Sequence, residues 1–532
     1  MTGSDIIIKM LIDEGVTDVF GYPGGAVMPL YDALYRYRGK IKHTRTSHEQ
    51  WAAHAADGFA RASGKIGVSI ATSGPGATNL VTGIATAFAD SVPVLFITAN
   101  VTTDEIGTDS FQEADITGIT LPVCKYNWIV KNPQDLPKTI NKAIKLSKSG
   151  RPGPVLVDVP KDILTHEYGS RYDYRKHSET DDSVECRMPE QDFPTEDKFI
   201  KIADIINKSK RPFIISGGGV GISGAQKELV DFCEKLNSPV GFTLMSMGIM
   251  SAMHPLNVGM LGKYGSETAK KIFSEADTVI ACGMRFSNRT HEANLEGKKI
   301  IHIDADAAEV NKNVHATDSL IGDAKAVIEK LSGYICPRNS NWAASKMKTT
   351  RLEWDDVPGK YSALFGEICK VLGENQFVVT DVGNHQMTVA KFYPFLGKRR
   401  FITSGGFGTM GFGIGAAIGA KKAVPDANVV LFTGDASFRM SAVELLTLKQ
   451  SKIKILIVVM NNQSLGMVRD MQEKYFGGRF YETSANADVP RITALAKAYG
   501  LKGRKVSSYD ELMNALREYN ESKGSYVIDF RE

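Results

Sequence analysis

The feature that most constrains the fold is an alternation of short apolar runs with longer helical stretches. In the first part of the chain, residues 68–71, 93–98 and 154–159 are β-rich runs of strand length, and residues 50–62 have a helical pattern. This alternation predicts parallel strands connected by helices that cover both faces of a sheet. We therefore expect an α/β fold based on a doubly wound parallel sheet.

The same alternation occurs twice more. Apolar runs at 212–216, 278–282 and 299–303, and again at 376–380, 428–433 and 453–460, alternate with helical stretches. Two polar stretches with few aliphatic residues separate the three parts and are typical of linkers. The expected organisation is a first domain over residues 1–165, a linker over 166–194, a central domain over 195–336, a linker over 337–360 and a third domain over 361–532. The three domains look like copies of one architecture.

Composition excludes several classes of protein. With 532 residues, of which 43% are hydrophobic and 23% charged, the chain is long and apolar enough for several packed cores. A net charge of +4 gives no reason to expect a nucleic-acid or membrane-surface partner. No apolar run reaches the ~18 residues of a membrane span. The six cysteines are scattered with no CxxC pair, which excludes a cysteine zinc site and indicates a reducing compartment, so we expect a cytoplasmic protein.

Three glycine-rich segments resemble phosphate-binding loops. Residues 219–224 (GVGISG) and 406–411 (GFGTMG) both match GxGxxG, but the expected strand at 239–243 ends without the acid that would bind a ribose hydroxyl. Classical NAD binding is therefore disfavoured. Residues 72–79 (TSGPGATN) lack the lysine of a Walker loop. Taken singly, each segment is also explained as a tight strand-to-helix turn.

One pair of motifs indicates a metal-bound diphosphate. Asp435 follows the expected strand at 428–433, and Asn462 follows the next one, so both side chains should lie at the carboxyl edge of one sheet. A carboxylate, an amide oxygen and a backbone carbonyl suit Mg²⁺, which completes its shell with phosphate oxygens and water. Either motif alone would be better explained as a helix cap or a turn. Together, at this spacing, they favour a metal site.

These motifs also resemble a known family. GDA (434–436), followed 24 residues later by NN (461–462), resembles the thiamine-diphosphate signature, with Ala436 where glycine is usual. Along nearly the whole chain, further motifs look like those of the acetohydroxyacid (acetolactate) synthase large subunit, namely FGYPGGA, SHEQ, TSGPGATN, GTDSFQE, GRPGPVLVDVPKD, TSGGFGTMGFG and LGMVR. The resemblance implies a pyrimidine-binding domain, a central FAD- or nucleotide-binding-like domain and a diphosphate-binding domain.

The resemblance assigns roles around thiamine diphosphate and Mg²⁺. Glu49 would hydrogen-bond N1′ of the aminopyrimidine, the carbonyl of Gly408 would accept from its 4′-amino group, and Met410 would hold the cofactor bent. By itself, Glu49 is also explained as an acid in the first turn of a helix, and Met410 as core packing. Asp435, Asn462 and the carbonyl of Ser464 would bind Mg²⁺. The other cofactor positions are Pro23, Gly24, Thr72, Gly76, Asn79, Val382, Gly383, Asn384, His385, Gly434, Ala436, Ser437, Leu465, Gly466 and Met467.

The central part resembles the FAD-binding domain of these synthases, where the flavin has no redox role in turnover. The alternatives are a vestigial nucleotide fold and an ADP site. The matching positions are Gly217, Gly218, Gly219, Thr243, Leu244, Met245, Gly283, Arg285, Arg289, Asp304 and Asp323, with Arg151 from the first domain. The resemblance further places Gly25, Phe111, Gln112, Lys161 and Arg289 along the substrate channel, with Gln112 among the catalytic residues and Arg289 paired with the carboxylate of the acceptor.

Several positions depart from the synthase pattern. Met471 stands where the synthases have a tryptophan that favours 2-oxobutanoate as acceptor, and Lys263 stands where they have a methionine at the channel. Trp51 replaces a glycine or alanine, and Thr388 replaces a tryptophan. The departures leave the donor half intact and alter the acceptor half, because a lysine can neutralise an anionic acceptor. Alternatively, Lys263 extends outward to water.

Three hypotheses about function follow. In the first, the chain is an acetolactate-synthase-like carboligase that decarboxylates pyruvate on thiamine diphosphate and adds the hydroxyethyl unit to a second 2-keto acid. In the second, the cofactor is the same but the donor is another 2-keto acid, or the acceptor is an aldehyde, a sugar ketone or another anion. In the third, the chain is an inactive assembly partner, which the intact Glu49, Asp435 and Asn462 argue against. The resemblance also implies a homodimer or homotetramer with shared active sites, and allows a regulatory subunit.

Overall fold

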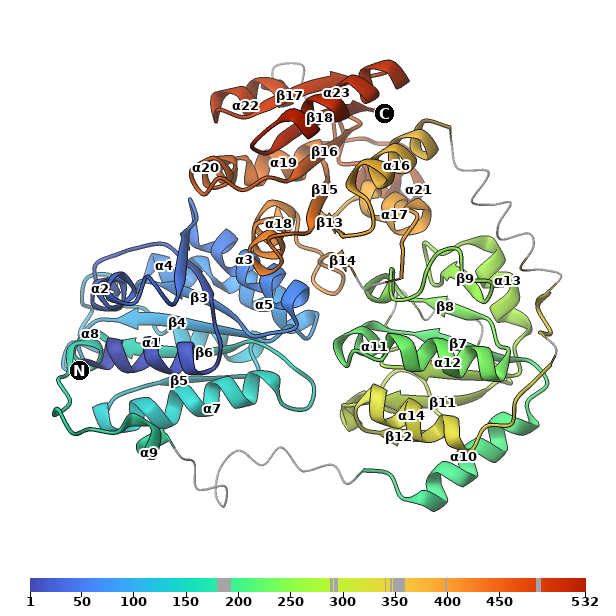
Figure 1. Cartoon of the computed structure of the whole chain (residues 1–532), viewed down its shortest axis with the longest axis horizontal. Coiled ribbons are helices and arrows are strands. Elements are labelled where there is room, and N and C mark those ends of the chain that lie inside the picture. Colours follow the sequence, from blue (N-terminus) through green and yellow to red (C-terminus); the bar gives the residue numbers. More distant parts are fainter. Residues whose placement is uncertain are drawn as a thin grey trace. The chain divides into compact units, whose positions relative to one another are not determined.

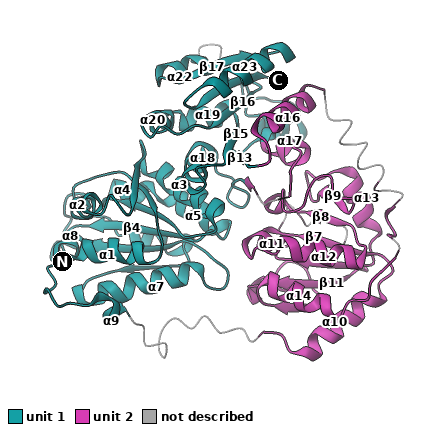
Figure 2. Cartoon of the chain, viewed as in Figure 1, with its two compact units in different colours: residues 1–187, 375–385, 402–532 teal, residues 188–374, 386–401 magenta. Residues whose placement is uncertain are grey.

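The computed structural model describes residues 1–178, 193–287, 290, 295–339, 341–344, 347, 359–397, 400–484 and 489–532. The chain divides into two compact units (Figure 2), of which unit 1 contains Met1–Arg187, Asn375–His385 and Ile402–Glu532, and unit 2 contains Met188–Glu374 and Gln386–Phe401. Three six-stranded sheets form the framework (Figure 1). The expected α/β class is confirmed.

The first sheet lies in unit 1 and has the strand order β2-β1-β3-β4-β6-β5, with parallel pairing throughout. The four inner strands, β1, β3, β4 and β6, are completely buried, as expected for a sheet covered on both faces, whereas the edge strands β2 and β5 are partly exposed. The strands are β1 (Asp18–Gly21), β2 (Lys42–Arg45), β3 (Gly67–Ala71), β4 (Val94–Asn100), β5 (Tyr126–Ile129) and β6 (Val155–Pro160). The helices are α1 (Gly3–Asp13), α2 (Met28–Arg36), α3 (Glu49–Ser63), α4 (Pro75–Asn79), α5 (Val81–Ala89), α6 (Ile116–Thr120), α7 (Leu136–Lys148), α8 (Lys161–Thr165) and α9 (Tyr174–Ser178).

The central sheet lies in unit 2 and has the parallel order β12-β11-β10-β7-β8-β9. Its strands are β7 (Pro212–Ser216), β8 (Val240–Phe242), β9 (Asn257–Met260), β10 (Thr278–Cys282), β11 (Lys299–Asp304) and β12 (Asp318–Ile321). The helices are α10 (Glu196–Lys208), α11 (Gly218–Ile222), α12 (Gln226–Leu236), α13 (Glu267–Glu275) and α14 (Ala324–Gly333).

The third sheet, again in unit 1 except for one residue of β14, has the order β14-β13-β15-β16-β18-β17 and is parallel from β13 to β17. Its strands are β13 (Gln376–Thr380), β14 (Phe401–Ile402), β15 (Asn428–Gly434), β16 (Leu456–Asn461), β17 (Lys502–Val506) and β18 (Tyr526–Arg531). The helices of unit 1 in this part of the chain are α18 (Phe412–Ala423), α19 (Asp435–Ser441), α20 (Leu445–Gln450), α21 (Gly466–Phe476), α22 (Ile492–Ala498) and α23 (Tyr509–Glu521), with a 3₁₀ turn, η5 (Ala442–Glu444). Helix α16 (Gly359–Leu372) lies in unit 2, and α17 (Asn384–Phe392) begins in unit 1 and continues in unit 2.

The sheets are not three copies of one topology. The first and third share one strand order, whereas in the central sheet the first three strands run in one direction before the chain returns to place β10 beside β7. The expectation of three equal copies is right for the parallel α/β class and wrong for the strand order of the central sheet. Strand order depends on the direction in which each crossover connection turns, and the apolar pattern of a strand does not predict that direction.

A shared core joins the first and third sheets within unit 1. Helices α3 and α18 cross in close contact, and apolar residues of both belong to one buried cluster that reaches from Phe20 to Val527. Both helices are rich in alanine and glycine at the crossing. A Cβ at Gly419 would lie 1.9 Å from the carbonyl oxygen of Ala55, so only glycine permits this approach. The α3–α18 crossing therefore fixes the carboxyl edges of the two sheets relative to one another.

The stretch after the first sheet is partly packed rather than free. Tyr168 is 5% exposed and belongs to the buried cluster beneath α1 and α7, and Glu167 forms an antiparallel bridge with Thr2. Residues 179–192 lie outside the described ranges. Among the helices of the described ranges, none is both long and apolar enough to cross a membrane.

Candidate active site

Glu49 is the first residue of α3, in the first segment of unit 1 (Met1–Arg187). The ring of His48 caps the helix by accepting from the backbone N–H of Gln50. The Glu49 side chain is buried at 8% exposure, and its Oε2 accepts from Nδ2 of Asn79 at 3.0 Å. Gly76 lies beside its other oxygen, and a Cβ there would be 3.2 Å from Oε1. The start of α3 thus carries one buried carboxylate whose two oxygens lie against Asn79 and Gly76.

Other residues expected around Glu49 come together on the same edge. Thr72, at 7% exposure, accepts through Oγ1 from the backbone N–H of Ala26, which ties the loop of Pro23, Gly24 and Gly25 to the end of β3. The carbonyl of Gln112 lies against Gly74, and Gln112 itself has a φ of +61°. Such a backbone conformation in a non-glycine residue is typical of positions that a site holds under strain.

The expected metal ligands follow two neighbouring strands. Gly434 at the end of β15 is in register with Met460 of β16, so Asp435 and Asn462 project from the same edge of the third sheet. Asp435 is 1% exposed, and its Oδ2 pairs with Nη1 of Arg439 at 2.7 Å. Its Oδ1 is buried and has no hydrogen-bond partner among the described residues. A buried polar atom without a partner is costly, and a cation would satisfy it.

The remaining ligands and the diphosphate positions lie close to Asp435. Oδ1 of Asn462 accepts from the backbone N–H of Ser464 at 3.0 Å, and this bond closes the tight turn that carries both expected ligands. A Cβ at Gly466 would meet Nδ2 of Asn384 at 2.6 Å and Nδ2 of Asn462 at 3.0 Å. The loop of Val382, Gly383, Asn384 and His385 therefore borders the turn of Leu465, Gly466 and Met467.

The donor set fits Mg²⁺ and a diphosphate. One carboxylate oxygen, one amide oxygen and one backbone carbonyl are the hard oxygen ligands that Mg²⁺ takes in proteins. Nε2 of His385 is also buried without a partner among the described residues, and burial lowers the pKa of this ring to about 4. Ser437 donates to the carbonyl of Val382 at 3.3 Å, so the start of α19 meets this loop. The described residues contain no cluster of three or more His, Cys, Asp or Glu side chains, and the expected site needs only one.

Gly408 and Met410 lie in the loop of residues 403–411, between β14 and α18. Thr403, Ser404 and Thr409 are buried, whereas Phe407 is 53% exposed. Gly406 is exposed as well, whereas Gly405, Gly408 and Met410 are half-buried.

Asp381 was missed by the sequence analysis. Its carboxylate accepts from the backbone N–H groups of Val382, Gly411 and Gly413 at 3.0, 2.8 and 3.2 Å. Burial raises the pKa of Asp381 to about 6 against the effect of these bonds. One buried acid thus connects the diphosphate loop with the end of the Met410 loop. An acid directly after the apolar run at 376–380 was the available signal.

In unit 2, the expected flavin positions line the carboxyl ends of the central strands. The backbone N–H of Gly219 donates to the carbonyl of Gly283 at 2.9 Å, and a Cβ at Gly217 would lie 2.2 Å from that same oxygen. Gly217, Gly218 and Gly219 therefore pack at the point between β7 and β10 where the strand order reverses, which is where open α/β sheets bind nucleotides. The neighbouring strand ends carry Thr243, Leu244, Met245, Arg285, Asp304 and Asp323.

Some of these positions have structural roles of their own. Asp323 caps α14 by accepting from the backbone N–H groups of Lys325 and Ala326, and Asp304 accepts from that of Asp306. Arg289 lies outside the described residues. Arg151 donates through Nε to Oγ of Ser91 at 2.8 Å in unit 1.

Four of the expected substrate residues, Phe111, Lys161, Lys263 and Met471, have exposed side chains. Phe111 is 87% exposed and Met471 is 48% exposed. Lys161 is exposed at the start of α8. Lys263 is also exposed, and its ammonium lies 5.9 Å from the ring centre of Tyr264.

Comparison with known proteins gives the same assignment along the chain. Three models of the thiamine pyrophosphate enzymes match, namely the N-terminal TPP binding domain at residues 1–119, the central domain at 199–331 and the C-terminal TPP binding domain at 381–530. A probable acetolactate synthase large subunit of Methanocaldococcus jannaschii is 42% identical over 99% of this chain and 91% of that protein. The acetolactate synthase large subunit of Lactococcus lactis is 40% identical over 98% and 91%, and that of Escherichia coli isozyme 3 is 39% identical over 97% and 92%. The chain therefore belongs to the thiamine-diphosphate-dependent enzymes of the acetolactate synthase large-subunit family.

Proposed function

We propose that this chain is a carboligase that joins two 2-keto acids with loss of CO₂, and that pyruvate serves as donor and acceptor to give acetolactate. The observation that carries this proposal is that the carboxyl edges of the two sheets in unit 1 carry different groups, a buried acid at one and a candidate metal site at the other. One edge presents the buried carboxylate of Glu49, and the other presents the unpartnered Oδ1 of Asp435 beside the loop of His385.

When bound, thiamine diphosphate supplies the centre that accepts the electron pair released as the donor loses CO₂. Asp435, Asn462 and the Ser464 carbonyl would hold Mg²⁺, and the loop of Val382, Gly383, Asn384 and His385 with Ala436 and Ser437 would hold the diphosphate. Glu49 would hold a proton at N1′ of the aminopyrimidine, with Asn79 fixing the carboxylate. The carbonyl of Gly408 would accept from the 4′-amino group, and Met410 would support the bent conformation.

The central sheet supports a proposal of FAD binding in a structural role. The glycine contacts between β7 and β10 leave room for backbone to approach a diphosphate at the switch point. Measuring the flavin that copurifies with the protein, and its release on heating, tests this directly. A homodimer or homotetramer with a shared site, and association with a regulatory subunit, are further proposals that rest on the family. Sedimentation of the purified chain tests the first of them.

A second candidate keeps the donor reaction and changes the acceptor. Lys263 and Met471 are both exposed and both depart from the pattern of the synthases. A cation at this position favours an acceptor with an added negative charge. We therefore expect competition between pyruvate and other acceptors to depend on Lys263.

The decisive experiment is an end-point assay with thiamine diphosphate, Mg²⁺, FAD and pyruvate alone, in which CO₂ and acetolactate are measured together. One acetolactate for each CO₂, from two pyruvates, is the expected result. CO₂ or acetaldehyde without acetolactate would support the second candidate and reject the first. No consumption of pyruvate, in a protein shown by calorimetry to bind thiamine diphosphate, would reject pyruvate as the donor.

A further inference from the structure

The loop of residues 403–411 is held from outside by the first segment of unit 1. It contains four glycines in nine residues, so its backbone has many conformations of similar energy unless other groups restrict it. Within the segment of the third sheet, Thr380 donates to Oγ1 of Thr403 and Gly411 donates to Asp381. Further polar contacts of the loop come from α3, from α5 and from Asp90, the residue that caps α5.

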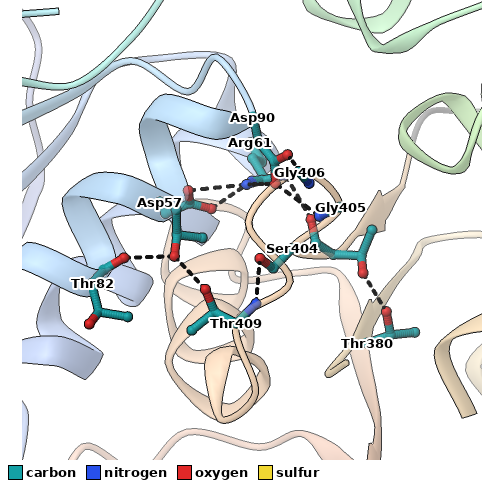
Figure 3. A network of polar contacts seen from close by, with 11 residues as sticks. Asp57, Arg61, Thr82, Asp90, Thr380, Ser404, Gly405, Gly406 and Thr409 are labelled. Atoms are coloured by element: carbon teal, nitrogen blue, oxygen red, sulfur yellow. Dashed lines mark hydrogen bonds and ion pairs between the residues drawn. The ribbon is translucent and has the colours of Figure 1, made fainter. Parts of the chain in front are cut away.

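The start of the loop is fixed by a buried charge cluster (Figure 3), which consists of Asp57, Arg61 and Asp90. Arg61 pairs with Asp57 at 2.6 Å and with Asp90 at 3.0 Å, and its Nη1 donates to the carbonyl of Thr403 at 2.9 Å. The Asp90 carboxylate in turn accepts from the backbone N–H groups of Gly405 and Gly406 at 3.1 and 2.7 Å. Both carboxylate side chains are fully buried, so these bonds are shielded from water.

The end of the loop is fixed by two further side chains. The hydroxyls of Thr86 and Thr409 lie 2.7 Å apart in a buried hydrogen bond. The indole N–H of Trp51 donates to the carbonyl of Gly411 at 2.9 Å. Met410 therefore lies between two residues whose positions are set by the first segment.

These contacts come from α3, which begins at Glu49, and from α5 and its capping residue, which lie beside α3. Trp51, Asp57 and Arg61 lie on α3, and α3 packs against α5, which carries Thr86. We propose that Trp51, Thr86 and the Asp57–Arg61–Asp90 cluster are positioning residues that fix the carbonyl of Gly408 and the side chain of Met410 for the aminopyrimidine ring. This inference rests on the proposed function, because it needs thiamine diphosphate to bind at this loop.

Trp51 gives the sharpest test, because the chain offers a matched control. In the central segment, Trp342 makes an equivalent bond, from its indole N–H to the carbonyl of Pro212 at 2.9 Å. Trp51→Phe and Trp342→Phe each remove one such bond and keep an aromatic ring. We expect Trp51→Phe to lower kcat about tenfold, and to raise the Kd for thiamine diphosphate about fivefold, with the KM for pyruvate unchanged. Trp342→Phe should match the wild type in all three.

Thr86 has a matched control as well. Thr44, on strand β2 of the first sheet, is also a buried threonine, and its hydroxyl has no partner among the described residues. Thr86→Val should lower kcat severalfold, and Thr44→Val should not. A structural role alone would shift the melting temperature without separating kcat from KM. The difference between near-ultraviolet circular dichroism spectra recorded with and without thiamine diphosphate provides a second reading, because it reports how the aminopyrimidine is held.

The outcomes separate this inference from the proposed function. If the wild type binds thiamine diphosphate and turns over, and both tryptophan variants behave alike, the positioning role is overturned. The same holds if Trp51→Phe raises the KM for pyruvate and leaves kcat unchanged. If the wild type itself fails to bind the cofactor, the proposed function fails first, and the inference fails with it.

Discussion

The first and third sheets share a strand order but differ in the chemistry of their carboxyl edges. In the first sheet, the loop after β2 leads to Glu49; in the third, the loop after the corresponding strand, β14, is the glycine-rich loop of Met410. After the third strands, β3 and β15, the first sheet carries Thr72 and the third carries Asp435. One topology therefore provides matching loop positions, and the residues placed there have different proposed roles, proton handling in the first sheet and metal binding in the third.

The match between the two sheets extends to a buried pair of side chains. In the first sheet, Asp158 of β6 accepts from Nδ2 of Asn100 of β4 at 2.7 Å. In the third, Asp529 of β18 accepts from Nδ2 of Asn461 of β16, also at 2.7 Å. Only the pair in the third sheet adjoins a candidate metal ligand, because Asn462 directly follows Asn461. The same buried Asp–Asn pair therefore lies next to the candidate metal site in the third sheet and next to no candidate ligand in the first.

The largest expected effect comes from removing the acid of the first edge. Glu49→Gln should lower kcat about 100- to 1000-fold, because the side chain can no longer exchange a proton with N1′. The affinity for Mg²⁺ and diphosphate should stay near that of the wild type, since those ligands come from the third edge. Steady-state kinetics and calorimetry measure the two quantities. Unchanged turnover would remove Glu49 from the mechanism.

The next-largest effect concerns Glu444, whose carboxylate connects the part of unit 1 with the third sheet to the part with the first sheet. Glu444 accepts from the backbone N–H of Ser47 at 2.8 Å and from Thr447 at 2.6 Å. Burial raises the pKa of Glu444 from 4.5 to about 7, so the folded protein keeps a proton that the unfolded chain has lost. This stabilisation is complete below pH 4.5 and is lost as the pH rises through 7, by up to about 3 kcal/mol.

Glu444→Gln should therefore flatten the pH dependence of stability, because glutamine carries no titrating proton and its oxygen still accepts from Ser47. Urea unfolding of the wild type and the variant at pH 5 and pH 8 measures the difference. An equal loss of stability between these pH values in both proteins would show that Glu444 does not cause it.

The smallest effect tests the paired acids of the two sheets. Asp158→Leu and Asp529→Leu should each cost about 1–3 kcal/mol, because each leaves the buried amide of its asparagine partner without an acceptor. Only Asp529→Leu should weaken Mn²⁺ binding, about threefold, since it releases Asn461 and with it the turn of Asn462. Mn²⁺ titration followed by electron paramagnetic resonance compares the two variants. Equal Mn²⁺ affinities would mean that the pair has no role in the site.

Sequence patterns predicted the strands well, because buried parallel strands are continuous apolar runs. β7 and β10 agree residue for residue with the expected runs at 212–216 and 278–282. The helical part between β15 and β16 consists of α19, η5 and α20, and α19 starts directly at Asp435. Strand order, and the crossing of α3 and α18, depend on contacts between distant residues and leave no local pattern.

The candidate site was predicted unevenly. Spacing alone indicated that Asp435 and Asn462 share a sheet edge, and β15 and β16 are neighbours as required. The role of Glu49 depended on the resemblance, because a lone acid in the first turn of a helix is common. Asp381 and the Asp57–Arg61–Asp90 cluster were missed, because most of the groups that they bind are backbone groups of the distant residues 403–413, which any residue type provides.

The ion pair between Arg439 and Asp435 has a consequence for the affinity of the proposed metal site. A buried carboxylate with no counter-charge would destabilise the fold, and Arg439 supplies that charge from within the same helix. Binding of Mg²⁺ at the proposed site would therefore exchange one cation for another at this carboxylate, or share the carboxylate between two. The affinity for Mg²⁺ would then report the difference between these two pairings, rather than the full attraction of an isolated carboxylate.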